Sequence, residues 1–323
     1  MKRLAVDSAL AAGVVAAGLA WRRGALEIPR QEGEATPAAR RGRDASTATP
    51  PGKDVRPVVA IARGDDPAAL ARAAVEALGG MGAFVSRGER VLLKPNIGWD
   101  RPPKFAANTN PDVVASVARL CLEAGAKEVV VTDSPCNNPQ RCFDKSGLAK
   151  ALEGLGVKLF VPTERDYVEK DLGGEVLRVW PVLRAVLECD KVVNLPIAKH
   201  HSSAVLTLGM KNWYGILGGG KRRGALHQEM ARSIAELASF VRPVLTVLDA
   251  YRILVRNGPQ GGSLMDTRET KTVMASRDAV AVDALASTLF ELTPKDVPYV
   301  PLGEQMGLGR ADLEAVDKIT VSG

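Results

Sequence analysis

Cysteine is scarce in this sequence of 323 residues, and its four cysteines follow no metal-binding spacing. They are Cys121, Cys136, Cys142 and Cys189, and no two of them form a Cys-x-x-Cys pair. Because iron–sulfur clusters and zinc knuckles need closely spaced thiolates, we expect neither. Cys136 and Cys142 either form a disulfide after export or remain, like the others, free thiols that pack as small apolar residues.

Aromatic residues are also few, at 4% of the chain, and no basic run is interleaved with them. The formal net charge is +6, but residues 1–56 hold ten Lys/Arg and six Asp/Glu and so contribute +4 of it. A nucleic-acid site combines stacking rings with a basic groove. The remaining residues have neither feature, and nucleic acid is therefore not an expected partner.

Two nucleotide-binding patterns are missing as well. The sequence contains no Gly-x-Gly-x-x-Gly dinucleotide fingerprint and no Gly-x-x-x-x-Gly-Lys-Ser/Thr phosphate loop. A redox role therefore requires a cofactor held in some other way.

The N-terminal segment has the composition of an export signal. Lys2 and Arg3 precede an apolar stretch from Ala9 to Trp21 that contains small residues near its end. Residues 1–21 are therefore expected to be a signal peptide or an N-terminal anchor, because residues 4–21 approach the ~20 needed to span a bilayer. Residues 22–56 lack hydrophobic periodicity and predict a flexible linker. We expect residues 57–323 to form a single α/β domain in the periplasmic or extracytoplasmic space.

Short apolar runs alternate with longer helical stretches through this domain, which predicts a sheet covered by helices. The strands are expected at 58–62, 90–93, 128–132, 157–161, 191–195, 244–248, 271–275 and 318–321, and the helices at 67–78, 111–124, 147–156, 228–240 and 279–292. Asn110 before Pro111, and Asp278, are expected to cap two of the helices. Strands that are apolar throughout are buried on both faces, so we predict a largely parallel or mixed sheet with helices on both faces.

All three histidines fall within one stretch, from residue 199 to residue 227, which also interrupts the strand–helix alternation. Histidine serves as a metal ligand or proton carrier near neutral pH, and a lysine with a lowered pKa serves as a base. The expected catalytic residues are Lys199, His200, His201, Lys211 and His227. The alternative is that these side chains belong to a solvated loop.

Other polar residues lie where predicted strands end, and ligands of open α/β sheets bind beyond the carboxyl ends of strands. The turn Gly218–Arg223 adds glycines whose N–H groups can converge on an anion, although a solvated loop explains it equally well. Asp249 either supports the site or caps a turn. The expected substrate-binding residues are Lys94, Asn96, Asn212, Gly219, Lys221 and Asp249.

Several separated blocks resemble the family catalogued as domain of unknown function 362. These blocks are 91–96, 194–196 with Lys199 and His201, 211–212 with Gly215, 248–250 with Gly258, Pro259 and Gly261, and 278–284. The resemblance implies an exported protein, without the cysteine-rich ferredoxin-like segment that some members carry. Within the last block, Asp283 either faces the site or pairs with an arginine.

A shorter pattern is similar to the nickel-pincer lactate racemases: His200 and His201, then Gly209 and Lys211, a glycine-rich turn and His227. This resemblance implies that His200, His201 and His227 are metal ligands or acid–base groups and that Lys199 and Lys211 hold anionic groups. It also implies a metal ion or a nickel-pincer-like cofactor, and an isomerase, racemase or oxidoreductase activity. The combined prediction is an enzyme acting on a small anionic molecule. The alternative is a non-catalytic protein that captures an anion or a metal ion.

Overall fold

The computed structural model describes residues 55–323, except for the side chain of Lys221. The expected signal peptide or anchor, and the expected linker up to residue 54, lie outside the described residues. Within residues 55–323, every helix is too short or too polar to cross a bilayer.

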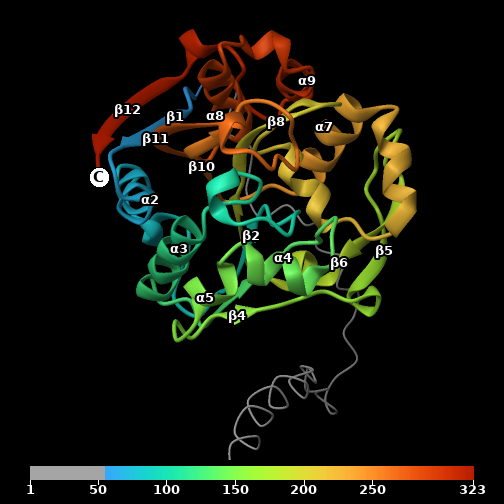
Figure 1. Ribbon diagram of the computed structural model, residues 1–323, viewed down its shortest axis with the longest axis horizontal. Helices are drawn as coiled ribbons and strands as arrows, with labels where there is room; N and C mark the ends of the chain where they lie inside the picture. Colours follow the sequence, from blue (N-terminus) through green and yellow to red (C-terminus); the bar gives the residue numbers. More distant parts are fainter. Residues whose placement is uncertain (1–54) are drawn as a thin grey trace, which may run out of the picture. The chain divides into compact units, whose positions relative to one another are not determined.

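The described chain is built around one large, mostly parallel sheet (Figure 1). Its strands, named by their position along the chain, are β1 Val58–Arg63, β2 Arg90–Pro95, β3 Glu128–Val131, β4 Lys158–Leu159, β7 Lys191–Leu195, β8 Ile197–His201, β9 Val205–Thr207, β10 Leu245–Leu254, β11 Thr267–Ser276 and β12 Asp317–Ser322. The order is β12-β1-β11-β10-β7-β2-β3-β4, with β8 paired to β10 and β9. Within this sheet, as described for residues 55–323, the antiparallel pairings are those of β11 with β1 and β10 and of β9 with β8. A separate antiparallel pair is formed by β5 Tyr167–Asp171 and β6 Val179–Leu183.

Three parallel strands bring the polar residues of the site to one edge of the sheet. β2 lies between β7 and β3, and Lys94 of β2 is in register with Asn194 of β7. These strands are buried because both faces of the sheet are covered. Their carboxyl ends meet at one edge, where Asn96 follows β2 and Asp133 lies just beyond β3.

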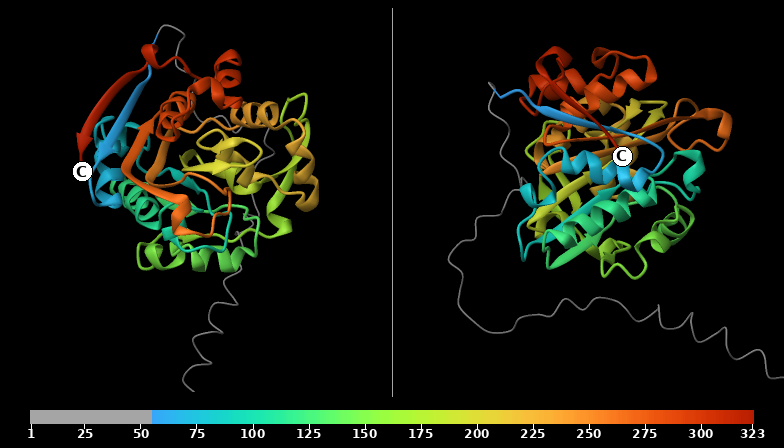
Figure 2. Two further views of the ribbon diagram at one scale, coloured as in Figure 1. Left: turned by 45° about the horizontal axis from the view of Figure 1, so that its top comes forward. Right: turned by 90° about the vertical axis from the view of Figure 1, so that its left-hand side faces the viewer.

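Helices cover both faces of the sheet, as Figures 1 and 2 show. They are α2 Pro67–Glu76, α3 Pro111–Glu123, α4 Pro139–Lys145, α5 Leu148–Leu152, α6 Arg184–Glu188, α7 Met230–Phe240, α8 Ala279–Ser287 and α9 Tyr299–Gln305. The apolar side chains of α2, α3 and α5 form one core with one face of the sheet. Those of α7, α8 and α9 form a second core with the opposite face. The predicted fold class is confirmed.

The helix starts follow from local hydrogen bonding. The side chain of Asn110 accepts a hydrogen bond from the N–H of Asp112, and that of Asp278 accepts one from Ala281. Each cap satisfies a backbone donor that the first turn of the helix leaves free. Both predicted caps are therefore confirmed.

All eight predicted strands are present, but the predicted helices are shorter. The third helix spans only Leu148–Leu152, and the last one ends at Ser287 before a 3-10 turn, Thr288–Phe290. The sequence did not predict β8 or β9, because β8 ends in the polar run Lys199–His201 and β9 is only three residues long. It also did not predict the β5–β6 hairpin.

Candidate functional site

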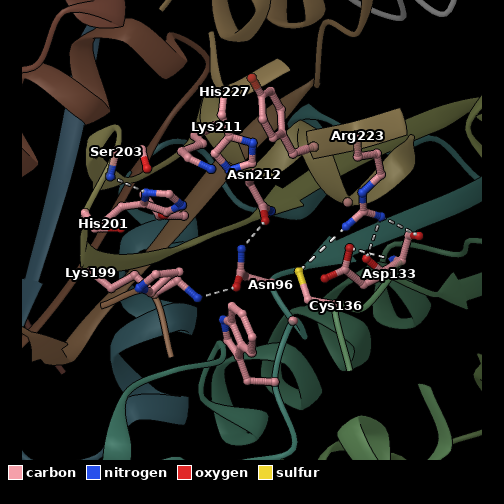
Figure 3. Close-up of a pocket in the computed structure, with 18 residues that line it drawn as sticks. Asn96, Asp133, Cys136, Lys199, His201, Ser203, Lys211, Asn212, Arg223 and His227 are labelled. Atoms are coloured by element: carbon pink, nitrogen blue, oxygen red, sulfur yellow. Dashed lines mark hydrogen bonds between the residues drawn. The ribbon is translucent and has the colours of Figure 1, made fainter. Parts of the chain in front are cut away.

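A cavity of about 350 Å³ opens at the carboxyl edge of the sheet. Figure 3 shows Lys199 and His201 on one side of it, Arg223, Cys136 and Asp133 on the other, and Asn96 and Asn212 between them. Its polar lining comes from segments that are far apart in sequence: the ends of β2 and β3, the β8–β9 hairpin, and the 3-10 segments Lys211–Ile216 and Gly220–His227. The predicted convergence of residues 199–227 is thus partly realised.

The alternation of side chains along β8 determines which of its polar residues line the cavity. Successive side chains of a strand point to opposite faces. Lys199 and His201 are two residues apart and both line the cavity. His200 lies between them and turns away, and its Nδ1 accepts a hydrogen bond of 3.0 Å from the N–H of Gly258. His200 therefore does not share the cavity with the other two histidines.

Lys199 is a buried lysine that has no carboxylate partner among residues 55–323. Its side chain is only 1% exposed, and Nζ donates to Asn96 Oδ1 at 2.8 Å and to the carbonyl of Ala107 at 2.5 Å. Burial lowers the pKa of this ammonium from 10.5 to about 7, and the nearby charge of Lys211 contributes to that decrease. At neutral pH a large share of Lys199 is therefore the free amine.

Lys211 is a second buried cation on the same cavity. Its Nζ lies 4.5 Å from the centroid of the Tyr214 ring, and its side chain is 7% exposed. Burial lowers its pKa to about 8. Among residues 55–323, no carboxylate forms an ion pair with Lys211 or Lys199. The aromatic face stabilises the ammonium but does not neutralise it. An anion in the cavity therefore meets the charge of Lys211 and that of the protonated share of Lys199.

Three asparagine side chains orient Lys199 through a connected hydrogen-bond network. Asn96 accepts from Lys199 and donates through Nδ2 to Asn212 Oδ1 at 3.0 Å. Asn212 in turn donates to Asn194 Oδ1 at 2.8 Å and to the carbonyl of Lys94 at 2.9 Å. Asn194 donates to the carbonyl of Gly209. Because every amide has a fixed partner, Asn96 is held with its oxygen toward Lys199.

The carboxylate that lines the cavity is already occupied. Asp133 Oδ1 lies 2.7 Å from Lys94 Nζ, and both side chains are buried. Asp133 also accepts from the N–H groups of Ile97 and Ser134. A Cβ on Gly215 would lie 1.8 Å from Asp133 Oδ1, so only glycine fits beside this pair. Lys94, predicted to bind substrate, does not line the cavity but forms an ion pair with Asp133, which does.

His201 is held as a neutral donor. Its Nδ1 accepts from the N–H groups of Ser203 at 3.1 Å and Ala204 at 3.3 Å, which leaves the ring proton on Nε2. Burial, together with the charges of Lys211 and Lys199, lowers the pKa of His201 to about 2. The ring therefore donates a hydrogen bond from Nε2 at neutral pH and does not serve as a base.

His227 has the opposite tautomer. Its Nδ1 lies 3.1 Å from the carbonyl of Gly224 and donates to it, which leaves a free lone pair on Nε2. The two ring centroids of His227 and His201 are 6.5 Å apart. The cavity thus has one imidazole, His201, that donates a hydrogen bond from Nε2, and one, His227, whose Nε2 can accept a hydrogen bond.

The residues predicted to bind a metal do not fit that task. A histidine that binds a metal through Nε2 normally donates its other N–H to an oxygen, whereas Nδ1 of both His200 and His201 accepts from backbone N–H groups. Within residues 55–323, no three His, Cys, Asp or Glu side chains are grouped as metal ligands. Of the predicted metal set, His227 alone has a ligand-competent Nε2 in this structure.

Asp249 and Gly219, also predicted to bind substrate, lie outside the cavity lining. Asp249 is buried and accepts from the N–H groups of Asn110 and Tyr251, so it holds the start of α3 and the backbone of its own strand, β10. Gly219 is exposed, with a φ of 86°, at the start of the second 3-10 segment. The side chain of Lys221 is outside the description.

Several cavity residues were not among the predicted ones. Arg223 donates to Ser134 Oγ at 3.1 Å and lies 3.6 Å from Cys136 Sγ. It belongs to the glycine-rich basic turn, so that motif does contribute a cation to the cavity. Thr207 reaches the cavity by pairing with Lys199 across β8 and β9, and nothing in the sequence indicates that pairing. All four cysteines are free thiols.

Asp283 holds the segment that carries Lys211 and Asn212. It is fully buried and accepts from the N–H of Gly209 at 2.6 Å and of Met210 at 2.8 Å. Burial raises the pKa of this carboxyl to about 7. The sequence left two alternatives for Asp283, a carboxylate that faces the site or one that pairs with an arginine. In the structure Asp283 instead accepts hydrogen bonds from backbone N–H groups.

Comparison with known proteins gives three likenesses. Residues 91–288 match the family model described as Domain of unknown function (DUF362). The chain is 33% identical over 245 residues to the Thylakoid-associated protein sll1697 of Synechocystis sp., covering 73% of this chain and 74% of that protein. The lactate racemase apoprotein of Thermoanaerobacterium thermosaccharolyticum aligns with a TM-score of 0.39 and 10% identity, over 71% of this chain and 56% of that one. That last likeness is too distant to indicate an activity.

Proposed function

The chain belongs to the family described as Domain of unknown function (DUF362), and we propose that it is an exported enzyme acting on a small anion in this cavity. The observation that carries the proposal is the pair of buried lysines, Lys199 and Lys211, which line one cavity and have no carboxylate partner among residues 55–323. Burying an unpaired charge costs several kcal/mol, by general estimates roughly 3–5. A bound carboxylate or phosphate relieves that cost.

The cavity also separates binding groups from reactive ones. Lys211 and Arg223 are cations suited to hold the anionic group of a ligand. His201 offers a fixed N–H to an oxygen, and His227 offers a lone pair that can take up a proton. Lys199, as a free amine near neutral pH, is suited to accept a proton or to attack carbon.

The export of the protein is a separate part of the proposal. The basic and apolar N-terminal segment of the sequence supports it, and the relative named above is thylakoid-associated. Mass spectrometry of protein purified from its own host would identify the mature N-terminus. An intact residue 1 in a cytoplasmic fraction would contradict export.

Binding and turnover can be tested with pyruvate, oxalate and phosphate as probes. We expect at least one of them to bind in isothermal titration, with affinity lost by about tenfold or more in Lys211→Met. Lys295→Met, which removes an exposed lysine in the same way, serves as the matched control. If none of the three binds, the proposed anion site is rejected.

Catalysis is distinguished from simple capture by proton exchange. Pyruvate incubated with the protein in D₂O should exchange its methyl protons, followed by NMR, and His227→Gln should slow exchange about 10²-fold while leaving binding unchanged. Binding without exchange would favour the alternative, a non-catalytic anion-binding protein. Elemental analysis of the same preparation tests whether a metal accompanies the protein.

A further inference from the structure

We propose that Lys199 is a nucleophile that forms an imine with the carbonyl carbon of a small ketone or aldehyde bearing an anionic group. This inference rests on the proposed function and names the substrate class of that site.

The hydrogen bonds of Lys199 leave one direction of its nitrogen open. Two of the three ammonium protons go to Asn96 Oδ1 and to the carbonyl of Ala107, and both acceptors are neutral. Lys199 also lines the cavity, so the third position faces the space a ligand would occupy. When that third proton leaves, both hydrogen bonds remain and the lone pair faces the cavity. An amine held in this way is oriented for attack on a carbonyl carbon.

The contrast with Lys94 shows why Lys199 is the reactive lysine. Lys94 is equally buried, but its Nζ is bound to Asp133 at 2.7 Å and it does not line the cavity. Lys199 has no such partner among the described residues, and burial brings its pKa to about 7. A lysine that is desolvated and lies near another cation is the kind that forms imines near neutral pH.

A second cation lies where it can hold the substrate's anionic group. Lys211 lines the same cavity, and Arg223 lies across it from Lys199 (Figure 3). An anion bound between them brings a neighbouring carbonyl group into the space that Lys199 faces. Fixing the reactants in this way lowers the entropy cost of the bimolecular step.

The carbonyl oxygen also has partners ready for it. Thr207 is directly opposite Lys199 in the β8–β9 register, so both side chains share one face of the hairpin. Its Oγ1 is buried, and within residues 55–323 it has no hydrogen-bond partner. The Nε2–H of His201 lines the same cavity. A buried hydroxyl without a partner is costly, and a substrate oxygen would satisfy it.

The atoms and charges balance as follows. The Lys199 nitrogen donates its lone pair to the carbonyl carbon, the C=O π pair moves to oxygen, and one N–H proton passes to that oxygen to give a carbinolamine. The hydroxyl then takes a further proton, the C–O bond breaks, water leaves, and the remaining nitrogen–carbon bond becomes a protonated imine. Overall, one amine, one carbonyl and one proton give one iminium ion and one water. The lone pair of His227 Nε2 and the ammonium of Lys211 are the cavity groups that can relay these protons.

The test is reductive trapping on the intact chain. The protein is incubated with pyruvate or with dihydroxyacetone phosphate in the presence of sodium cyanoborohydride, and the product is examined by intact mass and peptide mapping. We expect one reduced adduct per chain, located on Lys199. Acetone, which carries no charge, should label Lys199 at least tenfold more slowly.

Matched variants sharpen the result. Lys199→Arg keeps the positive charge but cannot form an imine, and it should lose the adduct. Thr207→Val keeps the shape of the side chain but removes a partner of the carbonyl oxygen, and it should slow labelling about tenfold. Lys295→Arg should label like the unsubstituted protein. If Lys199→Arg does not fold, peptide mapping of the unsubstituted chain still identifies the labelled lysine.

The outcomes separate this proposal from the one it rests on. A label found only on Lys211 or on exposed lysines would overturn the imine. Pyruvate that binds without any label from either probe would also overturn it, while the anion site would stand. If none of pyruvate, oxalate and phosphate binds, the anion site and the imine are both rejected.

Discussion

Lys94 Nζ lies 2.7 Å from Asp133 Oδ1, and this buried pair occupies the carboxylate that lines the cavity. Within residues 55–323, Lys199 and Lys211 are thereby left as buried ammonium groups without an ion pair. The sheet edge thus contains one lysine that is structural and two that can meet a ligand. The predictions below follow from this division.

Lys199 should contribute stability that rises with pH between about 7 and 10.5. The pKa of Lys199 is lowered from its ordinary value of 10.5 to about 7 because the group is buried. Between these values the unfolded chain binds the proton and the folded chain does not, so folding is favoured as pH rises. One lysine contributes a slope of at most about 1.4 kcal/mol per pH unit. Urea unfolding at several pH values measures it.

Lys199→Met is the variant that checks the origin of this slope. It removes the titrating group and should reduce the slope over pH 7–10.5, whereas Lys295→Met should leave it unchanged. An equal slope in Lys199→Met and in the unsubstituted chain would show that Lys199 is not the titrating group.

Gly215→Ala should destabilise the fold. A Cβ there would lie 1.8 Å from Asp133 Oδ1 and 2.7 Å from Lys94 Nζ, and both partners are buried. Overpacking of this kind costs about 1–3 kcal/mol, and disturbing the ion pair adds to it. Gly82→Ala is the control, because a Cβ at Gly82 meets nothing within 4 Å. Similar unfolding midpoints for the two variants in urea would contradict the prediction.

Asp283→Asn should weaken anion binding as well as stability. An amide group cannot accept from both Gly209 N–H and Met210 N–H, and these residues directly precede Lys211. We expect a loss of about 1–3 kcal/mol in unfolding free energy, together with a several-fold fall in pyruvate affinity by titration.

Asp278→Asn provides the comparison for Asp283. Asp278 caps α8, the helix that contains Asp283. It accepts hydrogen bonds from the N–H groups of Ala281 and Arg310 and does not line the cavity. Asp278→Asn should lower the stability of the protein without changing the affinity of the folded protein for pyruvate. If both variants change affinity equally, Asp283 acts only through global stability.

Anion binding should also stabilise the protein against heat. A ligand that binds only the folded state at a hundred times its dissociation constant adds about 2.7 kcal/mol. The gain from pyruvate at pH 7 should exceed the gain at pH 10, because Lys199 and Lys211 lose their charges over that range. Thermal unfolding with and without pyruvate at the two pH values checks this. A gain that does not depend on pH would place the anion elsewhere.

Local sequence patterns were enough to predict most of the fold. Runs such as Val91–Leu93 and Val129–Val131 are apolar throughout because helices cover both faces of the sheet. Asn110 and Asp278 marked helix starts correctly because capping depends on the residue and its immediate neighbours. These are short-range properties, and a single sequence contains them in full.

The membership of the site depended on contacts between distant segments. His200 and His201 are adjacent in sequence, yet only His201 lines the cavity, because their strand turns alternate side chains to opposite faces. Thr207 lies beside Lys199 because β8 and β9 pair. Lys94, unlike Lys199, has a carboxylate partner, because Asp133, 39 positions further along the chain, lies next to its ammonium. The sequence by itself determined the strands, the helix caps and the stretch that contains the reactive residues. Only the tertiary structure decided which cations are neutralised and which are left to meet a ligand, because the pKa of a buried group depends on neighbours that the folded chain brings together.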